Sequence, residues 1–389
     1  IALIFDDNSN KFKSYLHGIP VLGKPEILLD TDFKHGLDKL IIALPIVSSR
    51  RIKEVVNIAN NTGLTCEIVP SMEELTTGRV RVSKLRKVQI QDLLRRDSVQ
   101  LETKNIRELI QGKVVAVTGA GGSIGSELCR QLDRLQPAKL ILIDQGEFNL
   151  YSIASELAES GNGVDILPLL ADVCDESAMR HIFSSHKPEV VFHAAAYKHV
   201  PLLQDQARET VRNNVMGTRV VAEASIVAGC QTFVLISTDK AVNPTSLMGA
   251  SKRMAEIVCQ VLDQESSTRF VTVRFGNVLG SAGSVVPLFQ KQIEGGGPVT
   301  VTHPDMTRYF MSIPEAVRLV LHSGVIAKSG DLCVLDMGEQ VNILKLAEYL
   351  ITMAGKKPHA EIEIAFIGAR PGEKLAEELL TEAEARRMR

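Results

Sequence analysis

The four residues that follow the apolar run 233–236 carry groups suited to proton transfer. Ser237, Thr238, Asp239 and Lys240 come directly after this run, which has the composition of a buried strand. Ligands of open parallel sheets bind beyond the carboxyl ends of the strands, which is where these side chains fall. A carboxyl group beside an amine can supply one proton and remove another. The alternative interpretation is a pair of charges on a surface turn.

A further reactive group lies in the helix that is predicted to follow. Met248 and Lys252 are four residues apart in the segment Met-Gly-Ala-Ser-Lys, so they share one helical face. The thioether of Met248 cannot exchange a proton, so by itself this residue is as well explained by core packing.

A glycine-rich loop, TGAGGSIG at 118–125, follows the apolar run Val114–Val117 and opens a helix that is expected to end near Leu135. Gly119 permits a tight turn, Gly122 lets the backbone approach a pyrophosphate, and Gly125 allows close packing of helix on sheet. The helix N-terminus offers free N–H groups and a partial positive charge to phosphates. This context predicts a dinucleotide site in preference to a turn without a ligand.

Two acidic residues follow the next strands of this pattern. Asp144 lies 19 residues after Gly125, close to the spacing of about 20 residues expected for a ribose-binding acid. A carboxylate accepts hydrogen bonds from a 2′-hydroxyl and repels a 2′-phosphate, so we expect NAD in preference to NADP. Asp172 could reach the adenine edge from the end of the following strand, or it could be a simple strand-end residue.

The elements that position these groups alternate between strands and helices. Near-continuous apolar runs separated by helical patterns predict a parallel sheet covered by helices on both faces. A shorter β-α-β rhythm near the N-terminus, with a helix ending near Asn60, predicts a second, small parallel sheet. The predicted strands are Leu40–Leu44, Cys66–Val69, Val114–Val117, Leu140–Ile143, Ile166–Leu170, Val190–His193, Phe233–Ile236 and Phe270–Val273.

Composition excludes several classes of protein. The 389 residues include 44 Lys+Arg and 46 Asp+Glu, and this balance argues against nucleic-acid binding. No apolar run approaches the roughly 18 residues of a membrane-spanning helix. The six cysteines are scattered without a CxxC pair, which predicts free thiols in a reducing compartment. His193, His199 and His303 lack the spacing of a metal cluster, so we expect no metal.

The ends and the charge pattern suggest how the chain is divided. Ile1 opens within an apolar run, so we expect a fragment with sequence upstream, where a membrane anchor could lie. The predicted domains are 1–80 and 105–389, joined by a linker at 81–104. A basic segment at 79–104 predicts a solvated linker with one short helix, or a surface that faces a membrane or another domain. Seven of its basic residues lie close together: Arg79, Arg81, Lys84, Arg86, Lys87, Arg95 and Arg96.

Four segments together carry a resemblance to a known superfamily. The glycine spacing, HAAAYKHVPLL at 193–203, STDK at 237–240 and the residue-xxx-Lys pattern at 248–252 resemble the extended short-chain dehydrogenase/reductase superfamily. That superfamily normally has Tyr-xxx-Lys, and Met248 stands in place of the tyrosine. In this context Met248 is better interpreted as a replacement of that tyrosine than as core filler.

One branch of the superfamily matches in more detail. With Asp239-Lys240 and RPGEK at 370–374, the chain resembles the membrane-anchored, CapD-like UDP-N-acetylglucosamine 4,6-dehydratases of bacterial polysaccharide biosynthesis. The resemblance covers about 105–389 and implies a doubly wound α/β Rossmann sheet with a small C-terminal substrate lobe. Residues 1–80 resemble the truncated Rossmann-like N-terminal domain of these proteins.

The reaction of that family gives each residue a role. The sugar loses hydride from C4 to NAD, water leaves across C5 and C6, and hydride returns to C6. The resemblance assigns Lys240 as the base at C5 and Asp239 as the acid for the 6-hydroxyl, with Thr238 hydrogen-bonded to the C4 hydroxyl. Lys240 must be neutral to act as a base, which burial and the positive charge of Lys252 favour. Met248 cannot take the C4 proton, so Asp239 or a water molecule must.

The resemblance also implies residues that bind the two ligands. Arginine suits the diphosphate because its planar fork binds oxygens in pairs. The implied substrate-binding residues are Lys198, His199, Asn277, Arg308, Arg370 and Glu373. The implied cofactor-binding residues are Gly119, Gly122, Ser123, Ile124, Gly125, Asp144, Asp172, Val173, Ala194, Ala195 and Lys252.

Further expectations follow from the same family. The substrate is UDP-N-acetylglucosamine, and the long form with an N-terminal domain favours retention at C5. Superfamily members commonly dimerise through two helices, so a homodimer is expected. The expected location is the cytoplasmic face of a bacterial inner membrane, reached only through a segment upstream of this chain.

Two other functions remain open from the residues. A UDP-sugar 4-epimerase on the same fold would need a proton-transferring tyrosine and no adjacent acid–base pair, the reverse of what Met248, Asp239 and Lys240 provide. A non-catalytic NAD-sensing regulator would explain the loss of the tyrosine, but not the presence of Asp239, Lys240, Arg308 and Arg370.

Overall fold

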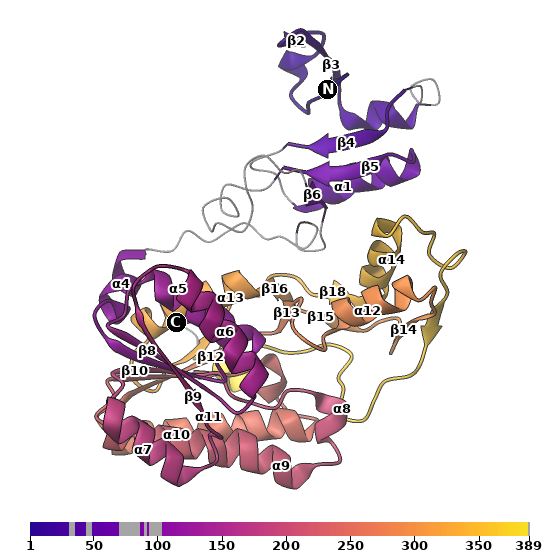
Figure 1. Ribbon diagram of the computed structural model, residues 1–389. Coiled ribbons are helices and arrows are strands. Elements are labelled where there is room, and N and C mark those ends of the chain that lie inside the picture. Colours follow the sequence, from indigo (N-terminus) through magenta and orange to yellow (C-terminus); the bar gives the residue numbers. More distant parts are fainter. Residues whose placement is uncertain (31–35, 44–48, 70–85, 89–91, 93–102, 388–389) are drawn as a thin grey trace. The chain divides into compact units, whose positions relative to one another are not determined.

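The computed structural model describes residues 1–30, 36–43, 49–69, 86–88, 92 and 103–387. The chain forms two compact units, each described by itself below (Figure 1). One comprises Ile1–Asp97, Gln290–Val299 and Leu346–Ile364. The other comprises Ser98–Phe289, Thr300–Lys345 and Ala365–Arg389, and is called the catalytic unit here.

A seven-stranded parallel sheet forms the centre of the catalytic unit. The strand order is β17-β12-β11-β10-β7-β8-β9, so the order reverses between β7 and β10. In open α/β sheets, ligands bind at such a switch point, beyond the carboxyl ends of the strands. The strands are β7 (Val114–Thr118), β8 (Lys139–Asp144), β9 (Asp165–Leu170), β10 (Val190–His193), β11 (Thr232–Ile236), β12 (Arg269–Arg274) and β17 (Leu332–Val334).

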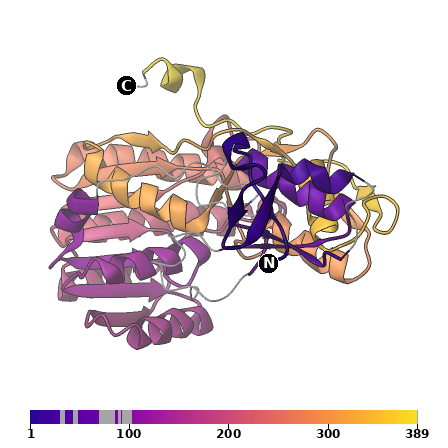
Figure 2. The ribbon, with the colours of Figure 1, turned by 90° about the horizontal axis from the view of Figure 1, so that it is seen from above.

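Helices cover both faces of this sheet (Figures 1 and 2). One face packs against α4 (Thr103–Ile110), α5 (Ser123–Arg134), α6 (Glu147–Glu159) and α13 (Ile313–Ile326). The other packs against α7 (Glu176–His186), α10 (Gly217–Val227) and α11 (Leu247–Glu265).

Side chains that alternate along each strand supply the two apolar cores. Along β7, Val115 and Val117 belong to the first core and Ala116 to the second, as the two-residue period of a strand requires. All three are fully buried. The predicted doubly wound α/β fold is confirmed.

The strand predictions differ from the structure mainly at one edge of the sheet. The six predicted strands from Val114 onward correspond to β7–β12 with shifts of one residue at their ends. The seventh strand, β17, was not predicted. It has only three half-buried residues and pairs with β12 from 58 residues further along the chain. Neither apolar periodicity nor length distinguishes such a segment from a loop.

Shorter elements of the C-terminal half form three small strand pairs, β13–β16, β14–β19 and β15–β18. These strands are β13 (Asn277–Leu279), β14 (Val299–Val301), β15 (Thr307–Arg308), β16 (Phe310–Ser312), β18 (Val341–Asn342) and β19 (Ile364–Phe366). The remaining α-helices after β10 are α8 (Val200–Leu203), α9 (Ala207–Val211), α12 (Val285–Glu294), α14 (Ile343–Met353) and α15 (Glu382–Ala385).

The N-terminal residues contain two small sheets. In one, β4 and β5 are parallel and joined by α1, as the β-α-β rhythm predicts, and β6 adds an antiparallel strand. The bounds are β4 (Lys39–Ile42), α1 (Ser49–Asn61), β5 (Thr65–Ile68) and β6 (Arg86–Lys87). The other has the order β1-β3-β2, with β1 (Ile4–Phe5), β2 (Tyr15–Leu16) and β3 (Ile19–Gly23).

The predicted basic linker is only partly visible. Arg86 and Lys87 form β6, so this segment contributes a strand. The other five of these seven residues, Arg79, Arg81, Lys84, Arg95 and Arg96, lie outside the described residues.

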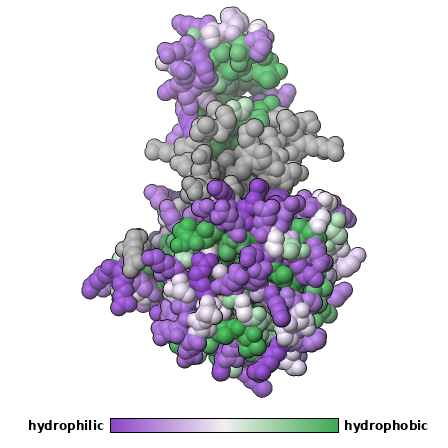
Figure 3. Space-filling model, turned by 90° about the vertical axis from the view of Figure 1, so that its left-hand side faces the viewer, coloured by the Kyte–Doolittle hydropathy of each residue, from purple (hydrophilic) through white to green (hydrophobic). Residues whose placement is uncertain are grey.

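The surface of the catalytic unit is mixed in polarity (Figure 3), and the cysteines are free. On the face in Figure 3, separate apolar patches lie within a mainly hydrophilic surface of the catalytic unit. Among the described helices, none is both long and apolar enough to cross a bilayer. All six cysteines are free thiols; Cys129, Cys230 and Cys259 are buried.

Candidate active site

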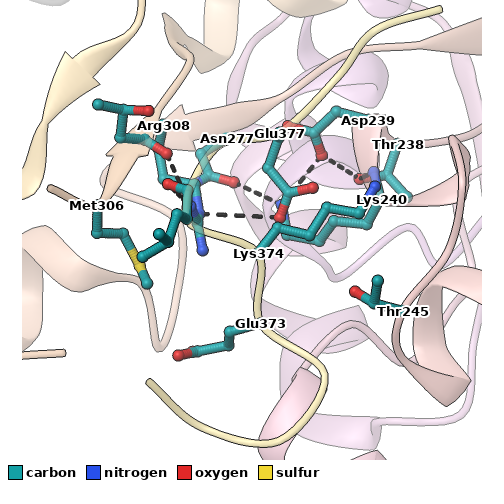
Figure 4. Close-up of polar contacts among 12 residues, drawn as sticks. Thr238, Asp239, Lys240, Thr245, Asn277, Met306, Arg308, Glu373, Lys374 and Glu377 are labelled. Atoms are coloured by element: carbon teal, nitrogen blue, oxygen red, sulfur yellow. Dashed lines mark hydrogen bonds and ion pairs between the residues drawn. The ribbon is translucent and has the colours of Figure 1, made fainter. Parts of the chain in front are cut away.

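The Asp239–Lys240 pair forms the centre of the candidate site (Figure 4). The chain leaves β11 and makes one 3₁₀ turn over Asp239–Ala241, for which the Thr238 side chain is the N-cap. Nζ of Lys240 donates to Oδ1 of Asp239 and to Oδ1 of Asn277, both at 3.0 Å. Oγ1 of Thr238 donates to the same Asp239 oxygen at 2.9 Å. The structure therefore joins four predicted site residues in one hydrogen-bonded group.

Glycine at position 249 allows α11 to approach this turn. A Cβ atom on Gly249 would lie 2.2 Å from the backbone oxygen of Lys240, which is far inside van der Waals contact. Ser246 caps the helix by accepting from the Gly249 amide at 3.1 Å. The Met-Gly-Ala-Ser-Lys segment therefore packs its first turn directly against the acid–base pair.

Met248 and Lys252 lie on the buried face of α11. Met248 is 4% exposed and packs with Val200 and Leu203 in a small apolar cluster. Lys252 donates from Nζ to the backbone oxygen of Ile236 at 2.6 Å, and burial lowers its pKa to about 8. Met248 is thus a packed core side chain in this structure, and it is not among the residues that line the cavity described next.

The predicted substrate-binding residues line a cavity of about 250 Å³ in the catalytic unit. Burial lowers the pKa of Lys198, and burial together with Lys198 lowers the pKa of His199. The cavity wall also carries the cationic side chains of Lys240, Arg308, Arg370 and Lys374, which suit a phosphate-containing ligand. The predicted residues on its wall are Lys198, His199, Lys240, Asn277, Arg308, Arg370 and Glu373.

The RPGEK segment closes one side of this cavity. Gly372 has φ +84° and lies so near Ser246 that a Cβ atom would be 2.8 Å from the Ser246 Cβ. Oγ1 of Thr245 donates to the backbone oxygen of Gly372, and Nζ of Lys374 donates to that of Val242 at 2.7 Å. These contacts attach 370–374 to the loop that follows the acid–base pair.

Arg308 lies at the end of β15 and also lines this cavity. Its side chain is 9% exposed, and Nη1 donates to the backbone oxygens of Thr307 and Leu375. The Nε atom lies 3.9 Å from Oε1 of Glu377. Arg308 is therefore held in place before any ligand binds.

Glu377 is a buried acid of the site that the sequence did not reveal. It lies seven residues after Arg370 in a strongly acidic tail, where a charged side chain is usually solvated. Here Glu377 is 4% exposed, lines the cavity and faces Lys240 (Figure 4). Its Oε2 atom has no hydrogen-bond partner among the described residues. Only its spacing from RPGEK could have drawn attention to it.

The glycine loop forms a cradle that fits a pyrophosphate. A Cβ atom on Gly125 would lie 1.9 Å from the backbone oxygen of Gly119, and one on Gly119 would lie 2.7 Å from the Ala195 amide nitrogen. Gly122 is the N-cap of α5 and offers no side-chain cap, so first-turn N–H groups are left for an anion. Ser123 and Ile124 form the first turn itself. These residues fit the dinucleotide that the sequence predicts.

The two acidic residues that are predicted to bind the cofactor, Asp144 and Asp172, already accept hydrogen bonds from other residues of the protein. Asp144 accepts from the amides of Gly121 and Gly146, both at 2.8 Å, which leaves further lone pairs for a ribose. Asp172 accepts from the Cys174 amide and from Arg212. Burial opposes ionisation of Asp172, but these hydrogen bonds outweigh it and lower its pKa. The adjacent predicted residues, Val173, Ala194 and Ala195, are buried or half-buried.

His193 has a structural environment. Its Nδ1 atom lies 2.7 Å from Oγ1 of Thr118, and its Nε2 atom lies 3.0 Å from Oγ1 of Thr218. Burial, aided by the charge of Lys252, lowers its pKa to about 3, so the ring is neutral. Within the described part of the chain there is no group of three or more His, Cys, Asp and Glu side chains placed to hold a metal.

A buried ion-pair network connects β12, α11 and α15 next to the candidate site. Arg274 is fully buried at the end of β12, and its guanidinium makes two hydrogen bonds to Glu256 of α11, at 2.7 and 2.6 Å. Ser237, immediately before Thr238, donates to the same carboxylate. Glu384 of α15 completes the network at 2.9 Å from Arg274. The network joins the C-terminal helix to the strand ends that carry the candidate catalytic residues.

The fold and site define a member of the extended short-chain dehydrogenase/reductase class. The chain belongs to the family described as "Polysaccharide biosynthesis protein", whose model matches residues 115–389. Residues 1–70 match a family described as "CoA-binding domain". The CapD-like resemblance predicted from the motifs is thereby confirmed.

Three relatives illustrate the sequence similarity of this chain to other bacterial proteins. Capsular polysaccharide biosynthesis protein CapD from Staphylococcus aureus is 49% identical over 98% of this chain; the chain spans only 64% of that relative. UDP-N-acetylglucosamine 4,6-dehydratase (inverting) from Campylobacter jejuni is 31% identical over 69% of this chain and 78% of its own. UDP-glucose 4-epimerase from Rickettsia rickettsii is 34% identical over 70% of this chain and 79% of its own length.

Solved structures share the fold of the catalytic unit. Pen from Bacillus thuringiensis has a TM-score of 0.66 at 31% identity, over 71% of this chain and 86% of that one. DesIV is a dTDP-glucose 4,6-dehydratase from Streptomyces venezuelae that was solved with NAD bound. It has a TM-score of 0.59 at 22% identity, over 70% of this chain and 89% of its own.

Proposed function

We propose that the protein is a NAD-dependent 4,6-dehydratase of UDP-N-acetylglucosamine that serves the synthesis of a bacterial surface polysaccharide. The observation that carries this proposal is the hydrogen-bonded group of Thr238, Asp239, Lys240 and Asn277, of which Lys240 and Asn277 line a cavity with several cationic side chains. Removal of water from a sugar requires a base and an acid close together, and this group supplies both.

In this proposal Lys240 removes the proton from C5, and the resemblance assigns the donor for the 6-hydroxyl to Asp239. Thr238, which already donates to Asp239, orients the hydroxyl at C4. Asn277 accepts from Nζ of Lys240 and so holds the amine toward the cavity. Met248, a packed core residue, takes no part in proton transfer.

The cofactor would be held by the glycine cradle, with Asp144 at the ribose and Lys252 at the nicotinamide side. Bound NAD would supply the acceptor and donor of hydride. The proposal of NAD over NADP is based on Asp144, whose carboxylate would repel a 2′-phosphate. DesIV, which shares the fold, was solved with NAD bound.

The substrate diphosphate would be held by the cationic residues of the cavity wall, above all Arg308, Arg370 and Lys198. Arg308 is already fixed by two backbone oxygens, so binding would cost little side-chain entropy. Incubation with UDP-N-acetylglucosamine and NAD, followed by mass spectrometry, tests the proposal. We expect a product lighter by one water; an unchanged mass would contradict it.

A second candidate is a UDP-sugar 4-epimerase, because a relative of that name is 34% identical over 70% of the chain. An epimerase would produce a sugar of unchanged mass. Met248 argues against it, because no proton-transferring side chain stands at that position. A non-catalytic NAD-sensing regulator would produce no change in the sugar at all.

We also propose that the protein is a homodimer that forms through α10 and α11. Met254, Ile257 and Val261 recur at helical spacing on α11, with exposures of 47%, 45% and 48%. A second copy would cover this stripe. Light scattering tests it: wild type should have the mass of a dimer, and Ile257→Glu that of a monomer. A monomeric wild type would contradict the proposal.

The resemblance to membrane-anchored dehydratases leads us to propose action at the cytoplasmic face of a bacterial inner membrane. Fractionation of the natural protein in its own host tests this location. Recovery entirely in the cytosolic fraction would contradict it.

A further inference from the structure

The short C-terminal helix α15 carries a carboxylate that does more than cap its own helix. Glu384 accepts from the Thr381 amide at 2.8 Å, and Oγ1 of Thr381 accepts from the Glu384 amide at 3.2 Å, so the two residues form a capping box. Glutamate side chains are mostly exposed in folded proteins. The Glu384 side chain is only 19% exposed, and its two oxygens also accept from Arg274 at 2.9 and 3.1 Å. The acid of the capping box is therefore also the partner of a buried arginine.

Arg274 lies fully buried between two carboxylates. On the side away from Glu384, its Nε and Nη2 atoms donate to Glu256, which is also fully buried, at 2.7 and 2.6 Å. Nη1 of Arg253 donates to both acids as well, at 2.9 Å to Glu256 and at 3.4 Å to Glu384. Two guanidinium groups thus share two carboxylates, and the four charges balance. Without the charge of Glu384, both arginines would compete for Glu256, and loss of one partner from a buried ion pair is strongly destabilising.

Glu256 connects the two arginines to residues 237–240, which are called the acid–base turn here. Its Oε1 atom accepts from Oγ of Ser237, the first residue of this turn. One helical turn earlier on α11, Lys252 donates to the backbone oxygen of Ile236 at 2.6 Å. The buried face of α11 thus holds the end of β11 and the start of the acid–base turn through two adjacent side chains.

We infer that Glu384 is a positioning residue of the active site, which acts through Arg274 and Glu256 to hold the acid–base turn in place. Glu384 is not among the residues that line the cavity, so it can affect the reaction only through other residues. The position of the turn can be measured on the protein alone. The effect on turnover rests on the proposed dehydratase function.

Four proteins are compared with wild type. Glu384→Gln removes the charge, but glutamine can still serve in a capping box, so α15 keeps its cap. Ser237→Ala removes the contact between the turn and Glu256, and the double variant combines the two changes. Glu382→Gln is the matched control, because it makes the same change on the same helix at a side chain that is 94% exposed and pairs with Arg386.

Hydrogen–deuterium exchange of the backbone amides measures how firmly the turn is held, without substrate. The informative amides are those of Ser237, Asp239, Ala241 and Val242, which donate to backbone oxygens. We expect Glu384→Gln to quicken their exchange by about 10-fold, as loss of a hydrogen bond to a charged group would. The amides of β8 serve as the reference for global opening and should change less. Glu382→Gln should resemble wild type.

The double variant tests the route of the effect. Because Glu384 is inferred to act through Glu256 on Ser237, exchange in the double variant should be close to that of Ser237→Ala alone. Sites that act independently would give effects that multiply. Turnover should follow the same order. Glu384→Gln should lower kcat by about 10-fold to 10²-fold, the cost of a small misplacement caused far from the chemistry, while KM and NAD affinity change little.

Three results would overturn the inference. The first is exchange in the turn of Glu384→Gln that is no faster than in wild type, or faster only in proportion to β8. The second is a double variant whose effects multiply. The third is an unchanged kcat in Glu384→Gln when wild type is active. Failure of the proposed function is distinguishable, because wild type would then release no water from the sugar while the exchange measurements still decide the inference.

Discussion

Nζ of Lys240 lies 3.0 Å from Oδ1 of Asp239, although the two residues are neighbours in the chain. Adjacent residues of a regular helix do not face each other. The 3₁₀ turn at Asp239–Ala241 and the long lysine stem make the contact possible, and Asn277 receives the amine from the other side. The acid–base pair is thus organised locally, before any ligand is bound.

The first prediction concerns Lys240. Lys240→Ala should abolish elimination, because no other amine lies at this position between Asp239 and Asn277. NAD binding should remain, since the glycine cradle is formed by other residues. Product formation and NAD affinity, by mass spectrometry and calorimetry, check the two parts. Near-normal turnover would reject the assignment, and an equal loss of NAD binding would leave it without support.

The second prediction concerns cofactor choice. Wild type should bind NAD more tightly than NADP, and Asp144→Ala should reduce this preference. The variant should also be less stable, because Asp144 accepts from the Gly121 and Gly146 amides that shape the loop. Titration of both cofactors into each protein provides the measurement. A wild type that prefers NADP would contradict the interpretation of Asp144.

The third prediction is an order of damage among three variants. Asp239→Asn should cost the most, about 10²–10⁴ in rate, because the amide keeps the shape of the side chain but cannot supply the proton for the 6-hydroxyl. Thr238→Val should cost less, and Met248→Ala the least in turnover. Turnover at saturating cofactor and substrate gives the order.

Folding must be controlled in the case of Met248, which is 4% exposed. Truncation of such a core residue typically destabilises by about 2–5 kcal/mol, whereas Met248→Leu should cost under about 1.5 kcal/mol. A folded Met248→Leu as inactive as Asp239→Asn would show that the thioether shapes the site.

The fourth prediction concerns acid stability. Burial opposes ionisation of Glu384, but hydrogen bonds from Arg274 and the Thr381 amide dominate and lower its pKa to about 2, from 4.5. Because the folded pKa is the lower one, this stabilisation is present above pH 4.5 and is lost as pH falls toward 2. Urea unfolding should show a steeper loss for wild type than for Glu384→Gln between pH 5 and 3. Parallel curves would contradict this account.

The sequence predicted the central sheet well because its strands are long, apolar and regularly spaced. Val115–Val117 and Leu140–Ile143 are fully buried, as is typical of strands inside a parallel sheet that is covered on both faces. β17 was missed because three half-buried residues carry too weak a pattern.

The site was predicted where motifs are continuous and missed where folding brings distant residues together. Thr238, Asp239 and Lys240 are consecutive, so their proximity could be inferred. The pairing of Arg274 with Glu256 spans 18 residues and that with Glu384 spans 110. Nothing in the local sequence around Glu377 signals that its carboxyl is buried, because that burial arises only in the folded chain, where its Oε1 atom lies 3.9 Å from Nε of Arg308.

We propose that this protein removes water from a sugar nucleotide across C5 and C6 while hydride passes from C4 to C6 through NAD. The most direct measurement uses UDP-N-acetylglucosamine labelled with deuterium at C4, with NMR of the product after reaction with NAD. We predict a product that has lost one water and carries the deuterium at C6. A sugar of unchanged mass with inverted configuration at C4, or an unaltered substrate, would contradict the account.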